Sequence, residues 1–379
     1  MAGPAIRAWQ FASALAPHND VELVTSAACT PPAEAPFPVR HVEANHVKEL
    51  LARTDVWVVQ GSILLDFPAI ESSEAIVVVD LYDPYHLENL ELRPERPMKD
   101  RLASVHNATA VLNRGIRRAD LVLTASDKQR DFWLGAMASL GRINPLTYEA
   151  DPSLRALVQV VPFGVDDQPP VHTKPVLRGV IPGVGAQDLV LLWGGGIYNW
   201  FDPLTLIRAV AELSKERDDV RLVFLGGKHP NPALPAMHMA ARAHALATEL
   251  GLTNKSVFFN DSWVPYGERG GWLLEADIGV STHLDHVETA FSFRTRILDY
   301  LWAELPMVVT EGDHFAEVVE ESGIGVVVPA QDVDALVGAL DRVLFDTDFL
   351  QSARSSLAEV REPYYWDNVL APLVDFVKS

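Results

Sequence analysis

Short apolar runs alternate with amphipathic stretches along the whole chain. The runs, such as Ile76–Val79 and Leu189–Trp193, contain almost no polar residues. Runs of this kind are typical of parallel strands that are buried on both faces of a sheet. The strands predicted in the first half are Val21–Thr25, Val56–Val59, Ile76–Val79, Leu121–Thr124 and Leu157–Val161. Those predicted in the second half are Leu189–Trp193, Arg221–Leu225, Val257–Phe259, Asp277–Val280 and Met307–Thr310.

Between these strands the apolar residues recur at helical spacing. The pattern predicts helices from the first glycine to about Leu15, from Pro203 to about Glu216, and over 236–251, 267–275 and 333–345. Strands and helices therefore alternate in both halves. This predicts an α/β protein with two doubly wound parallel sheets that face one cleft. Residues 167–188 are rich in proline and lack periodicity, so we expect them to begin the second domain as a linker. The predicted domains are 1–166 and 167–363.

The stretch 285–313 combines a helix with a cationic loop. Ile297, Leu301 and Leu305 lie at i, i+4 and i+8 and predict one buried helix face. Ser292 or Thr295 is expected to cap this helix, and the strand Met307–Thr310 follows it. A helix N-terminus behind a strand end offers free N–H groups and a positive dipole to an anion. Arg294 and Arg296 add two positive charges, so the stretch suits a phosphate or diphosphate; an ordinary α/β unit with surface arginines is the alternative.

The charge of the chain excludes some partners. The chain has 379 residues and a net charge of −20, from 51 acidic and 31 basic residues. This disfavours nucleic acid and a broadly anionic membrane as main partners. The basic residues from Arg93 to Arg130 are locally crowded, which favours a solvated helix face over a patch for a lipid-linked acceptor.

The cysteine content and the hydropathy of the chain indicate the cellular compartment to expect. Cys29 is the only cysteine, so no intrachain disulfide can form and a reducing, cytoplasmic location is expected. No apolar run is long enough to predict a transmembrane helix, and no secretory signal is predicted.

Ligands of open parallel sheets bind beyond the carboxyl ends of the strands, and this rule selects the candidate residues. In the first domain it selects Gly3–Arg7, Gln60–Ser62, Asp80–Asp83 with His86, and Ser126. In the second domain it selects Gly194–Asp202, Gly226–Lys228, Trp263–Tyr266 and His283–Arg296.

Several of these candidates have a plain structural alternative. Gly195 and Gly196 after a strand allow a backbone to approach a phosphate, although a turn would also use them. Lys228, Arg294 and Arg296 are the bases expected to supply charge, and Lys228 has a surface lysine as its alternative. Asp83 belongs to the densest polar set of the first domain, but Asp83-Pro84 is also a helix-start signal.

One stretch, Asp299–Thr310, contains Leu301-Trp-Ala-Glu-Leu-Pro306 followed by Val308-Val-Thr310. It resembles the donor-sugar motif of the retaining family-4 glycosyltransferases of the GT-B fold. Pro162-Phe-Gly-Val-Asp166 resembles that family's exit from its first domain. The resemblance implies two Rossmann-like domains around a central cleft. It also implies that the tail 364–379 packs back on the first domain.

The resemblance assigns roles to residues of this sequence. In the family, two glutamates flank seven residues; Asp299 matches the second, which contacts the nucleotide ribose. The first falls on Phe291, so Glu288 is the acid expected to face the donor sugar. The N–H groups of Phe291, Ser292, Phe293 and Arg294 are expected to face the leaving phosphate. Trp263–Tyr266, with Val264, matches the segment that holds the base, and a core tryptophan is the alternative for Trp263.

Two features of the family are missing here. Its enzymes usually carry an arginine and a lysine where this chain has Gly196 and Phe201, so the usual diphosphate clamp is absent. In the family a strand also precedes the first glycine turn, here at Gly3, which faces the donor phosphates. No sequence is present for that strand, and the loss of a central strand would leave its neighbours unpaired. We therefore expect that the chain was started at an internal methionine; the alternative is a domain that tolerates the loss of the strand.

The expected activity is retaining transfer of a sugar from a nucleoside diphosphate to a glycan, lipid-linked or small-molecule acceptor. Asp83, Glu288 and Arg296 are the predicted catalytic residues. Neither a metal nor a cofactor is expected besides the nucleotide-sugar substrate. The expected partners are the donor and the acceptor, with no nucleic acid, and weak peripheral membrane contact is an open alternative. The alternatives are a non-catalytic glycosyltransferase-like binding protein, and epimerase or pseudo-glycosidic chemistry on the same fold.

Overall fold

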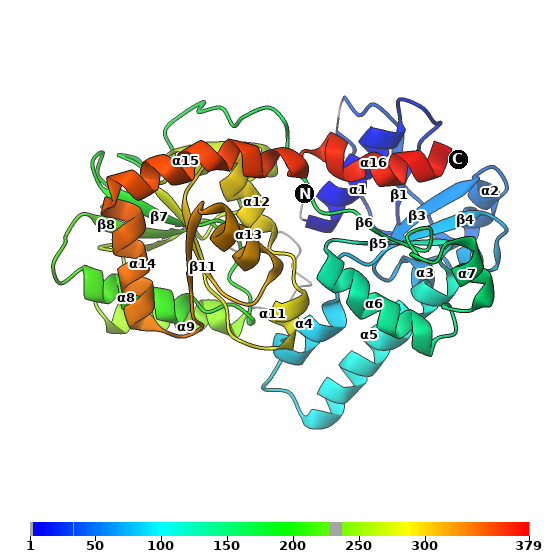
Figure 1. The fold of residues 1–379 in the computed structure, drawn as a ribbon, viewed down its shortest axis with the longest axis horizontal. Coiled ribbons are helices and arrows are strands. Elements are labelled where there is room, and N and C mark those ends of the chain that lie inside the picture. Colours follow the sequence, from blue (N-terminus) through cyan, green and yellow to red (C-terminus); the bar gives the residue numbers. More distant parts are fainter. Residues whose placement is uncertain (1–2, 33, 227–236, 379) are drawn as a thin grey trace. The chain divides into compact units, whose positions relative to one another are not determined.

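A computed structural model describes residues 3–32, 34–226 and 237–378 (Figure 1). The chain forms two compact units. Unit 1 comprises Met1–Phe163 and Trp366–Ser379, and unit 2 comprises Gly164–Tyr365. The first segment of unit 1 ends at Phe163, three residues before the end of the predicted 1–166 domain. The last helix, α16 (Trp366–Lys378), belongs to unit 1, where it packs against α1 (Gly3–Leu15).

Unit 1 contains a four-stranded parallel sheet in the order β3-β4-β5-β6. Its strands are β3 (Val56–Gln60), β4 (Ile76–Asp80), β5 (Leu121–Thr124) and β6 (Val158–Val160). Two shorter strands, β1 (Leu23–Thr25) and β2 (Val39–His41), pair in parallel with each other and not with this sheet. In the part of the chain that the structure describes, β3 is therefore an edge strand.

Helices cover the sheet of unit 1 because their apolar faces need burial. Trp57 and Val79 of the sheet share one buried cluster with Trp133 and Met137 of α6. The helices of this unit, besides α1 and α16, are α2 (Val47–Leu51), α3 (Ile63–Asp66), α4 (Tyr85–Leu92), α5 (Met98–Arg118), α6 (Asp127–Ser139) and α7 (Pro145–Ala150). No helix in the described ranges is both long and apolar enough to cross a membrane.

Unit 2 contains a six-stranded sheet in the order β12-β11-β10-β7-β8-β9, with every pairing parallel. Its strands are β7 (Leu189–Trp193), β8 (Val220–Phe224), β9 (Val257–Phe259), β10 (Ile278–Ser281), β11 (Met307–Thr310) and β12 (Gly325–Val328). The predicted strands 189–193, 257–259 and 307–310 are confirmed to the residue. β2 and β12 were not predicted.

The sheet of unit 2 is doubly wound, as predicted. α8 packs against α9 and α14, whereas α12 and α13 pack against α15. The helices of this unit are α8 (Pro203–Leu213), α9 (His238–Glu249), α10 (Arg269–Leu274), α11 (Val287–Phe291), α12 (Thr295–Trp302), α13 (His314–Ser322), α14 (Val333–Phe345) and α15 (Thr347–Arg361).

Glu275, directly after α10, anchors the start of unit 2. One of its carboxylate oxygens accepts the N–H of Val176 at 2.8 Å, and the other accepts those of Leu177 and Arg178 at 2.8 and 2.9 Å. His172 Nε2 lies 2.7 Å from the first oxygen. Burial raises the pKa of Glu275, but these hydrogen bonds together lower it more, so the pKa lies below its usual value.

Candidate functional site

The six-stranded sheet of unit 2 has its switch point between β7 and β10. From β7 the chain runs outward to β8 and β9, and then returns to place β10 on the other side of β7. Ligands of open α/β sheets bind in the crevice beyond the carboxyl ends of two such strands. Gly194–Gly196 follow β7 at this edge, and Thr282 and His283 follow β10. The topology by itself therefore selects this edge.

Arg296, in the first turn of α12, is a buried cation at this edge. Only 6% of the residue is exposed. Its Nη2 donates to the carbonyl oxygen of Gly196 at 2.9 Å. Its guanidinium carbon lies 4.0 Å from the ring centre of Phe201 and 4.5 Å from that of Trp193. Within the described residues, its Nη1 has no hydrogen-bond partner and no acid forms an ion pair with it.

Burial lowers the pKa of Arg296 from 12.5 to about 10. The guanidinium therefore stays protonated at neutral pH. A buried charge without a counter-charge is costly, because its lost hydration is not replaced. The structure thus confirms that Arg296 lies at the strand ends, and adds that no acid of the described residues lies within ion-pair distance of it, although the charge of Asp299 raises its pKa slightly against the effect of burial.

The glycine loop after β7 lies in van der Waals contact with this guanidinium. Gly195 has φ +146°, and a Cβ atom on it would lie 3.7 Å from Nη2 of Arg296. A Cβ atom on Gly226, after β8, would lie 2.3 Å from the backbone of Gly195. The loops after β7 and β8 therefore touch backbone to backbone. Arg296 lies against Gly196 and Phe201, the two positions at which the resemblance implied an arginine and a lysine.

Tyr300 of α12 fixes the start of the same loop. Its hydroxyl accepts the N–H of Gly194 at 2.8 Å and lies 2.9 and 2.8 Å from the carbonyl oxygens of Leu192 and Val280. A Cβ atom on Gly279 would lie 2.5 Å from its ring. The tyrosine thus fills the space between β7 and β10 and was not singled out from the sequence.

Glu288 and Arg294 form a buried ion pair. The terminal nitrogens Nη1 and Nη2 of Arg294 donate to the two carboxylate oxygens of Glu288 at 2.8 and 2.7 Å. Asp313 lies 3.8 Å from Nε of Arg294 and 3.5 Å from Nε2 of His283. The sequence predicted two positive charges here, from Arg294 and Arg296. Only Arg296 remains without an ion-pair partner among the described residues, because the carboxylate of Glu288 neutralises the charge of Arg294. The prediction of two available positive charges is therefore wrong.

Asp299, predicted to contact the ribose, is also paired. Its Oδ1 accepts Nε of Arg269 at 2.8 Å, and 24% of its side chain remains exposed. The guanidinium carbon of Arg269 lies 3.4 Å from the ring centre of Tyr266 and 4.3 Å from that of Trp302. Asp299 is therefore held in place by a cation between two aromatic rings.

The other predicted donor-site residues lie around these groups. Val264 is half-buried between β9 and α10. Phe291 ends α11, and Phe293 stacks on His314 with ring centres 5.5 Å apart. Ser292 donates both its N–H and its hydroxyl to the carbonyl oxygen of Thr289. The expectation of free N–H groups throughout 291–294 is therefore wrong at Ser292, and Lys228 lies outside the described residues.

Capping of α12 also differs from the prediction. Arg294 occupies the N-cap position and its side chain makes no capping hydrogen bond. Neither Ser292 nor Thr295 caps the helix, since α12 begins at Thr295 itself. The first N–H groups of α12 therefore lack a side-chain cap.

In unit 1, the strand ends are organised by Arg7. Its guanidinium donates to both carboxylate oxygens of Asp80 at 2.7 and 2.9 Å, and to the carbonyl oxygens of Val161 and Pro162 at 2.7 Å. Gln60 donates to the same carboxylate at 2.7 Å. Asp80 is thus a structural clamp rather than an available acid. Gly3 begins α1, and a Cβ atom added to it would lie 3.9 Å from the hydroxyl oxygen of Tyr82. Asp83 lies in the loop after β4, and its side chain is half-buried.

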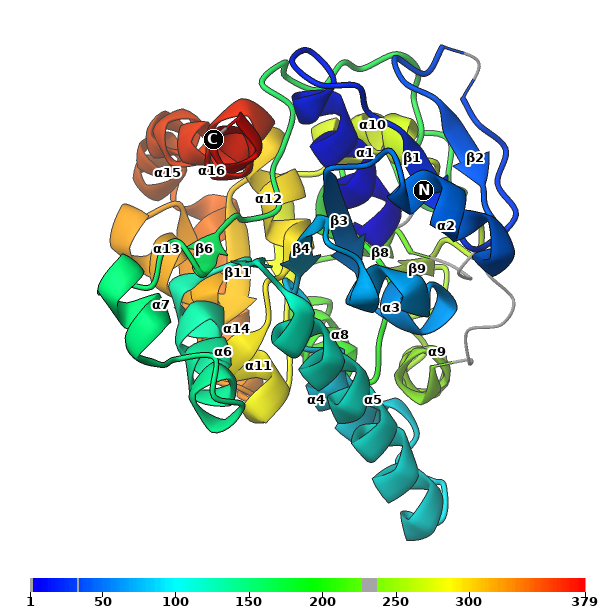
Figure 2. The same ribbon diagram turned by 90° about the vertical axis from the view of Figure 1, so that its right-hand side faces the viewer.

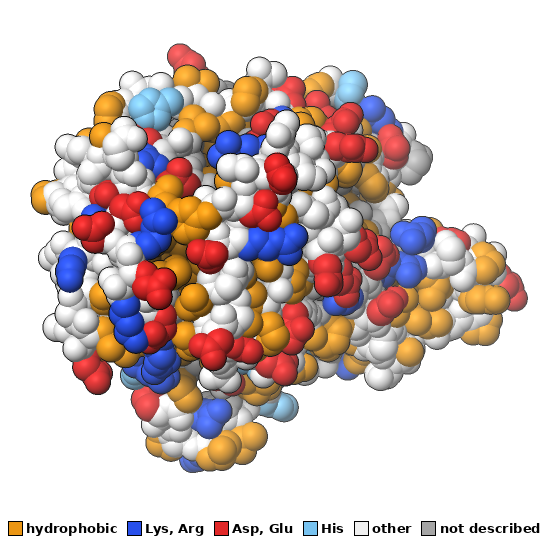
Figure 3. Space-filling view, turned by 60° about the vertical axis from the view of Figure 1, so that its left-hand side comes forward, with side chains coloured by type: hydrophobic (Ala, Val, Ile, Leu, Met, Phe, Trp, Pro, Cys, Tyr) orange, Lys and Arg blue, Asp and Glu red, His pale blue; other side chains and the backbone are white. Residues whose placement is uncertain are grey.

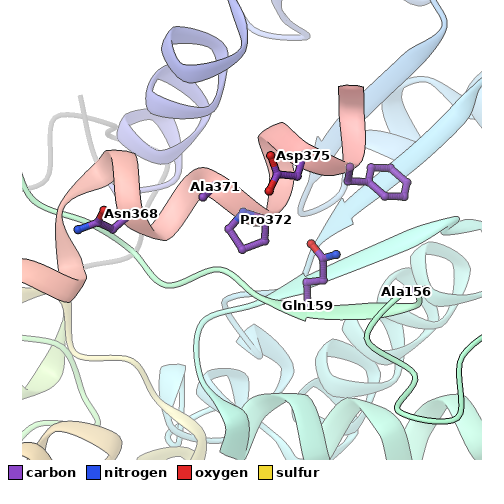
Figure 4. Close-up of a pocket in the computed structure, with 7 residues that line it drawn as sticks. Ala156, Gln159, Asn368, Ala371, Pro372 and Asp375 are labelled. Atoms are coloured by element: carbon purple, nitrogen blue, oxygen red, sulfur yellow. The ribbon is translucent and has the colours of Figure 1, made fainter. Parts of the chain in front are cut away.

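A groove of about 700 Å³ in unit 1 lies between α16 and β6 (Figure 4). It is lined by Ala156 and Gln159 on one side and by Asn368, Ala371, Pro372, Asp375 and Phe376 on the other. Ala156 precedes β6 and Gln159 is its middle residue, so the groove is not at the carboxyl end of the strand. It gathers no set of catalytic groups.

Solved structures identify the fold. Sucrose-phosphate synthase from Thermosynechococcus elongatus has a TM-score of 0.72 at 14% identity, over 100% of this chain and 93% of that chain. HepE from Anabaena, in complex with UDP-glucose, has a TM-score of 0.67 at 16% identity, over 100% and 96%. WaaG, a glycosyltransferase involved in lipopolysaccharide biosynthesis, has a TM-score of 0.64 at 17% identity, over 99% and 95%. The fold is therefore GT-B, with two Rossmann-like domains, as predicted.

The family model named Glycosyl transferases group 1 matches residues 188–346. This stretch contains all six strands of the unit 2 sheet and the residues around Arg296. The predicted resemblance to these glycosyltransferases is thus confirmed over that part of the chain, while the narrower assignment to family 4 stays a prediction. No curated protein matches the chain by sequence.

Proposed function

We propose that this protein is a retaining glycosyltransferase that uses a nucleoside-diphosphate sugar. The buried guanidinium of Arg296 at the switch point, which forms no ion pair with a described residue, carries this proposal. The family match over residues 188–346 supports a donor role for unit 2. HepE, which has the same fold, was solved in complex with UDP-glucose and with UDP.

In the proposed reaction, the bond between the anomeric carbon and the β-phosphate oxygen breaks. A bond from that carbon to the acceptor hydroxyl oxygen forms on the same face, and the hydroxyl proton passes to the leaving diphosphate. Negative charge develops on this diphosphate, and Arg296 stabilises it together with the uncapped N–H groups of α12. Removal of one such preorganised donor typically costs about 3 kcal/mol in the transition state.

The structure changes the roles that we assign to two acids. Glu288 is engaged by Arg294 through both oxygens, so we assign it to holding the 284–294 loop and not to the donor sugar. Asp299 keeps one oxygen outside its contact with Arg269, and we assign that oxygen to the ribose hydroxyls. Asp83 stays a predicted catalytic residue of unit 1, and the acceptor is unidentified.

A panel of nucleoside diphosphates and their sugars tests the proposal. A diphosphate that binds, when present at a concentration of about 100 times its Kd, should stabilise the folded chain by about 2.7 kcal/mol and raise its melting temperature. The responding donor is then incubated with candidate acceptors, and proton NMR reads the anomeric configuration of the product. A product with inverted configuration, or no response to any diphosphate, would contradict the proposal.

A non-catalytic nucleotide-sugar-binding protein is the second candidate. The pairing of both Glu288 and Asp299 with arginines favours it, because neither acid is fully available for catalysis. This candidate predicts a melting response to one donor with neither transfer nor donor hydrolysis. In either case Asp299→Ala should weaken binding of the responding diphosphate in calorimetry, and a urea melt of the same variant measures how much stability the loss of the ion pair with Arg269 costs.

A further inference from the structure

Arg269, the first residue of α10, links this helix to α12 within unit 2 (Figure 2). Only 7% of its side chain is exposed. Its Nε donates to Oδ1 of Asp299 at 2.8 Å, and its Nη1 donates to the carbonyl oxygen of Tyr266 at 2.8 Å. The planar guanidinium is thus held by hydrogen bonds on two of its nitrogens, and it fixes the carboxylate that it binds.

Two aromatic rings pack against this guanidinium. Its carbon lies 3.4 Å from the ring centre of Tyr266 and 4.3 Å from that of Trp302. The indole N–H of Trp302 donates to the carbonyl oxygen of Gln168 at 2.7 Å, so this ring is itself anchored. Arginine stacks on aromatic rings because its guanidinium is planar and weakly hydrated. The position of the Asp299 carboxylate is therefore set by a packed cation.

The positive charge of Arg269 is used inside the protein. Burial lowers the pKa of Arg269, but the charge and the hydrogen bond of Asp299, together with other nearby groups, raise it more, so the pKa lies above its usual value. The arginine therefore stays protonated and neutralises the carboxylate that it binds. Asp299 keeps 24% of its side chain exposed, so the oxygen outside this contact remains accessible.

Asp299 lies three residues after Arg296 on α12. The two side chains therefore leave the same side of the helix, about 4.5 Å apart along its axis. A carboxylate this close to a diphosphate bound at Arg296 would repel it if no cation neutralised the carboxylate. The chain has a net charge of −20, and acidic and basic side chains are mixed on the face that Figure 3 shows, so the neutralising cation has to be a local one.

We propose that Arg269 is a positioning residue for the donor nucleotide and that it acts through Asp299. It holds the carboxylate of Asp299 by one oxygen and leaves the other to accept one ribose hydroxyl of the nucleotide. It also cancels the negative charge of this carboxylate, so that a diphosphate can bind at Arg296 on the preceding turn of the helix. The inference rests on the proposed function, and it adds the residue that makes an acid compatible with a diphosphate site.

Calorimetry with the responding nucleoside diphosphate and its 2′-deoxy and 3′-deoxy forms tests the inference. The ribose discrimination is defined as the larger of the two ratios of deoxy-form Kd to parent Kd. Because a hydrogen bond to a charged group is lost with the hydroxyl, it should be about 10- to 100-fold in the original chain.

Arg269→Met keeps an apolar stem against the two rings but releases the carboxylate of Asp299. The ribose discrimination should therefore fall below about threefold. The deoxy forms should also bind about tenfold more weakly, because the carboxylate is no longer neutralised. The double variant Arg269→Met/Asp299→Ala removes the acid as well, so it should regain this tenfold loss without regaining the discrimination.

Arg178→Met is the matched control, because it breaks an ion pair of the same unit at the other edge of the sheet. Nη2 of Arg178 lies 2.6 Å from Oδ2 of Asp277, which directly precedes β10. The control should lose stability in a urea melt and keep the ribose discrimination. Arg269→Lys keeps a positive charge without the planar group, so it should bind the deoxy forms like the original chain and discriminate less.

The inference is overturned if Arg269→Met keeps the original ribose discrimination, or if Arg178→Met loses as much of it. If Arg269→Met does not fold, the lysine variant decides: a lower discrimination supports the inference and an unchanged one overturns it. An original chain that binds a diphosphate without ribose discrimination would also overturn it, while the proposed role of Arg296 would stand. If no diphosphate binds at all, the proposed function fails and this inference fails with it.

Discussion

Replacement of Arg296 by methionine should make the free protein more stable and remove its response to a nucleoside diphosphate. Methionine keeps an unbranched apolar stem against the Trp193 and Phe201 rings but carries no charge. If the guanidinium is there to bind a ligand, its buried charge lowers the stability of the protein when no ligand is bound. If it serves the fold, its removal should instead be destabilising.

The magnitude follows from the burial of the charge. Burial lowers the pKa of Arg296 from 12.5 to about 10. At about 1.36 kcal/mol per pKa unit, this corresponds to a cost of about 3 kcal/mol for the charged form in the folded protein. The cost is fully present at neutral pH, below both pKa values, and is relieved only as the pH rises through about 10.

Methionine also removes favourable contacts. The hydrogen bond to the carbonyl oxygen of Gly196 and the cation–π contacts contribute about 2 kcal/mol together. The sulfur regains part of this against the rings. The net expectation is a gain of about 1 kcal/mol, which raises the melting temperature of a domain of this size by about 2–4 °C.

Differential scanning calorimetry with and without the responding diphosphate is the assay. Arg294→Met is the matched control, because it makes the same substitution two residues away at an arginine that has a buried acid partner. That control should lose stability by about 3–5 kcal/mol. The reasoning is refuted if Arg296→Met melts below the original chain, or if it keeps the diphosphate-induced rise in melting temperature.

Further substitutions test the packing of unit 2. Glu288→Gln should destabilise unit 2 by about 3 kcal/mol, and the double variant Glu288→Leu/Arg294→Met should recover most of that loss in urea melts; equal losses in both would contradict a buried pair. Tyr300→Phe leaves the N–H of Gly194 without its acceptor, so it should cost about 1–3 kcal/mol by the same measurement. Glu275→Gln should be destabilising at pH 7, since the pKa of Glu275 is depressed in the folded state. The difference should shrink as the pH falls below about 4.5 and the original carboxylate becomes protonated; a difference that grows on acidification would be the wrong sign.

Most strands of the two main sheets were predictable, because a parallel strand that is buried on both faces appears in the sequence as an uninterrupted run of apolar residues. β5, β7, β9 and β11 match the predicted ranges to the residue. β12 carries the same signal in Ile324–Val328, whereas β2 is short and largely exposed and leaves no such record. The sequence-based rule about strand ends also selected Gly195, Gly196 and Arg296, which the structure brings together.

Pairing through space was not predictable from the sequence. Arg7 and Asp80 are 73 positions apart, and Arg269 and Asp299 are 30 apart. Spacing carries no information about such contacts, because they depend on how the loops at one sheet edge approach each other. The sequence therefore counted as available charges several groups that the fold has already paired.

The contrast between the two arginines of the 294–296 segment explains how one site can be both fixed and receptive. Arg294 and Glu288 compensate each other in the empty protein, so the loop that they hold has no reason to move when an anion arrives. Arg296 has no such partner among the described residues, and its burial amplifies its attraction for whatever negative charge comes within reach. The affinity that we propose for a diphosphate would thus be local, set by a single desolvated cation against the long-range repulsion of a chain with a net charge of −20.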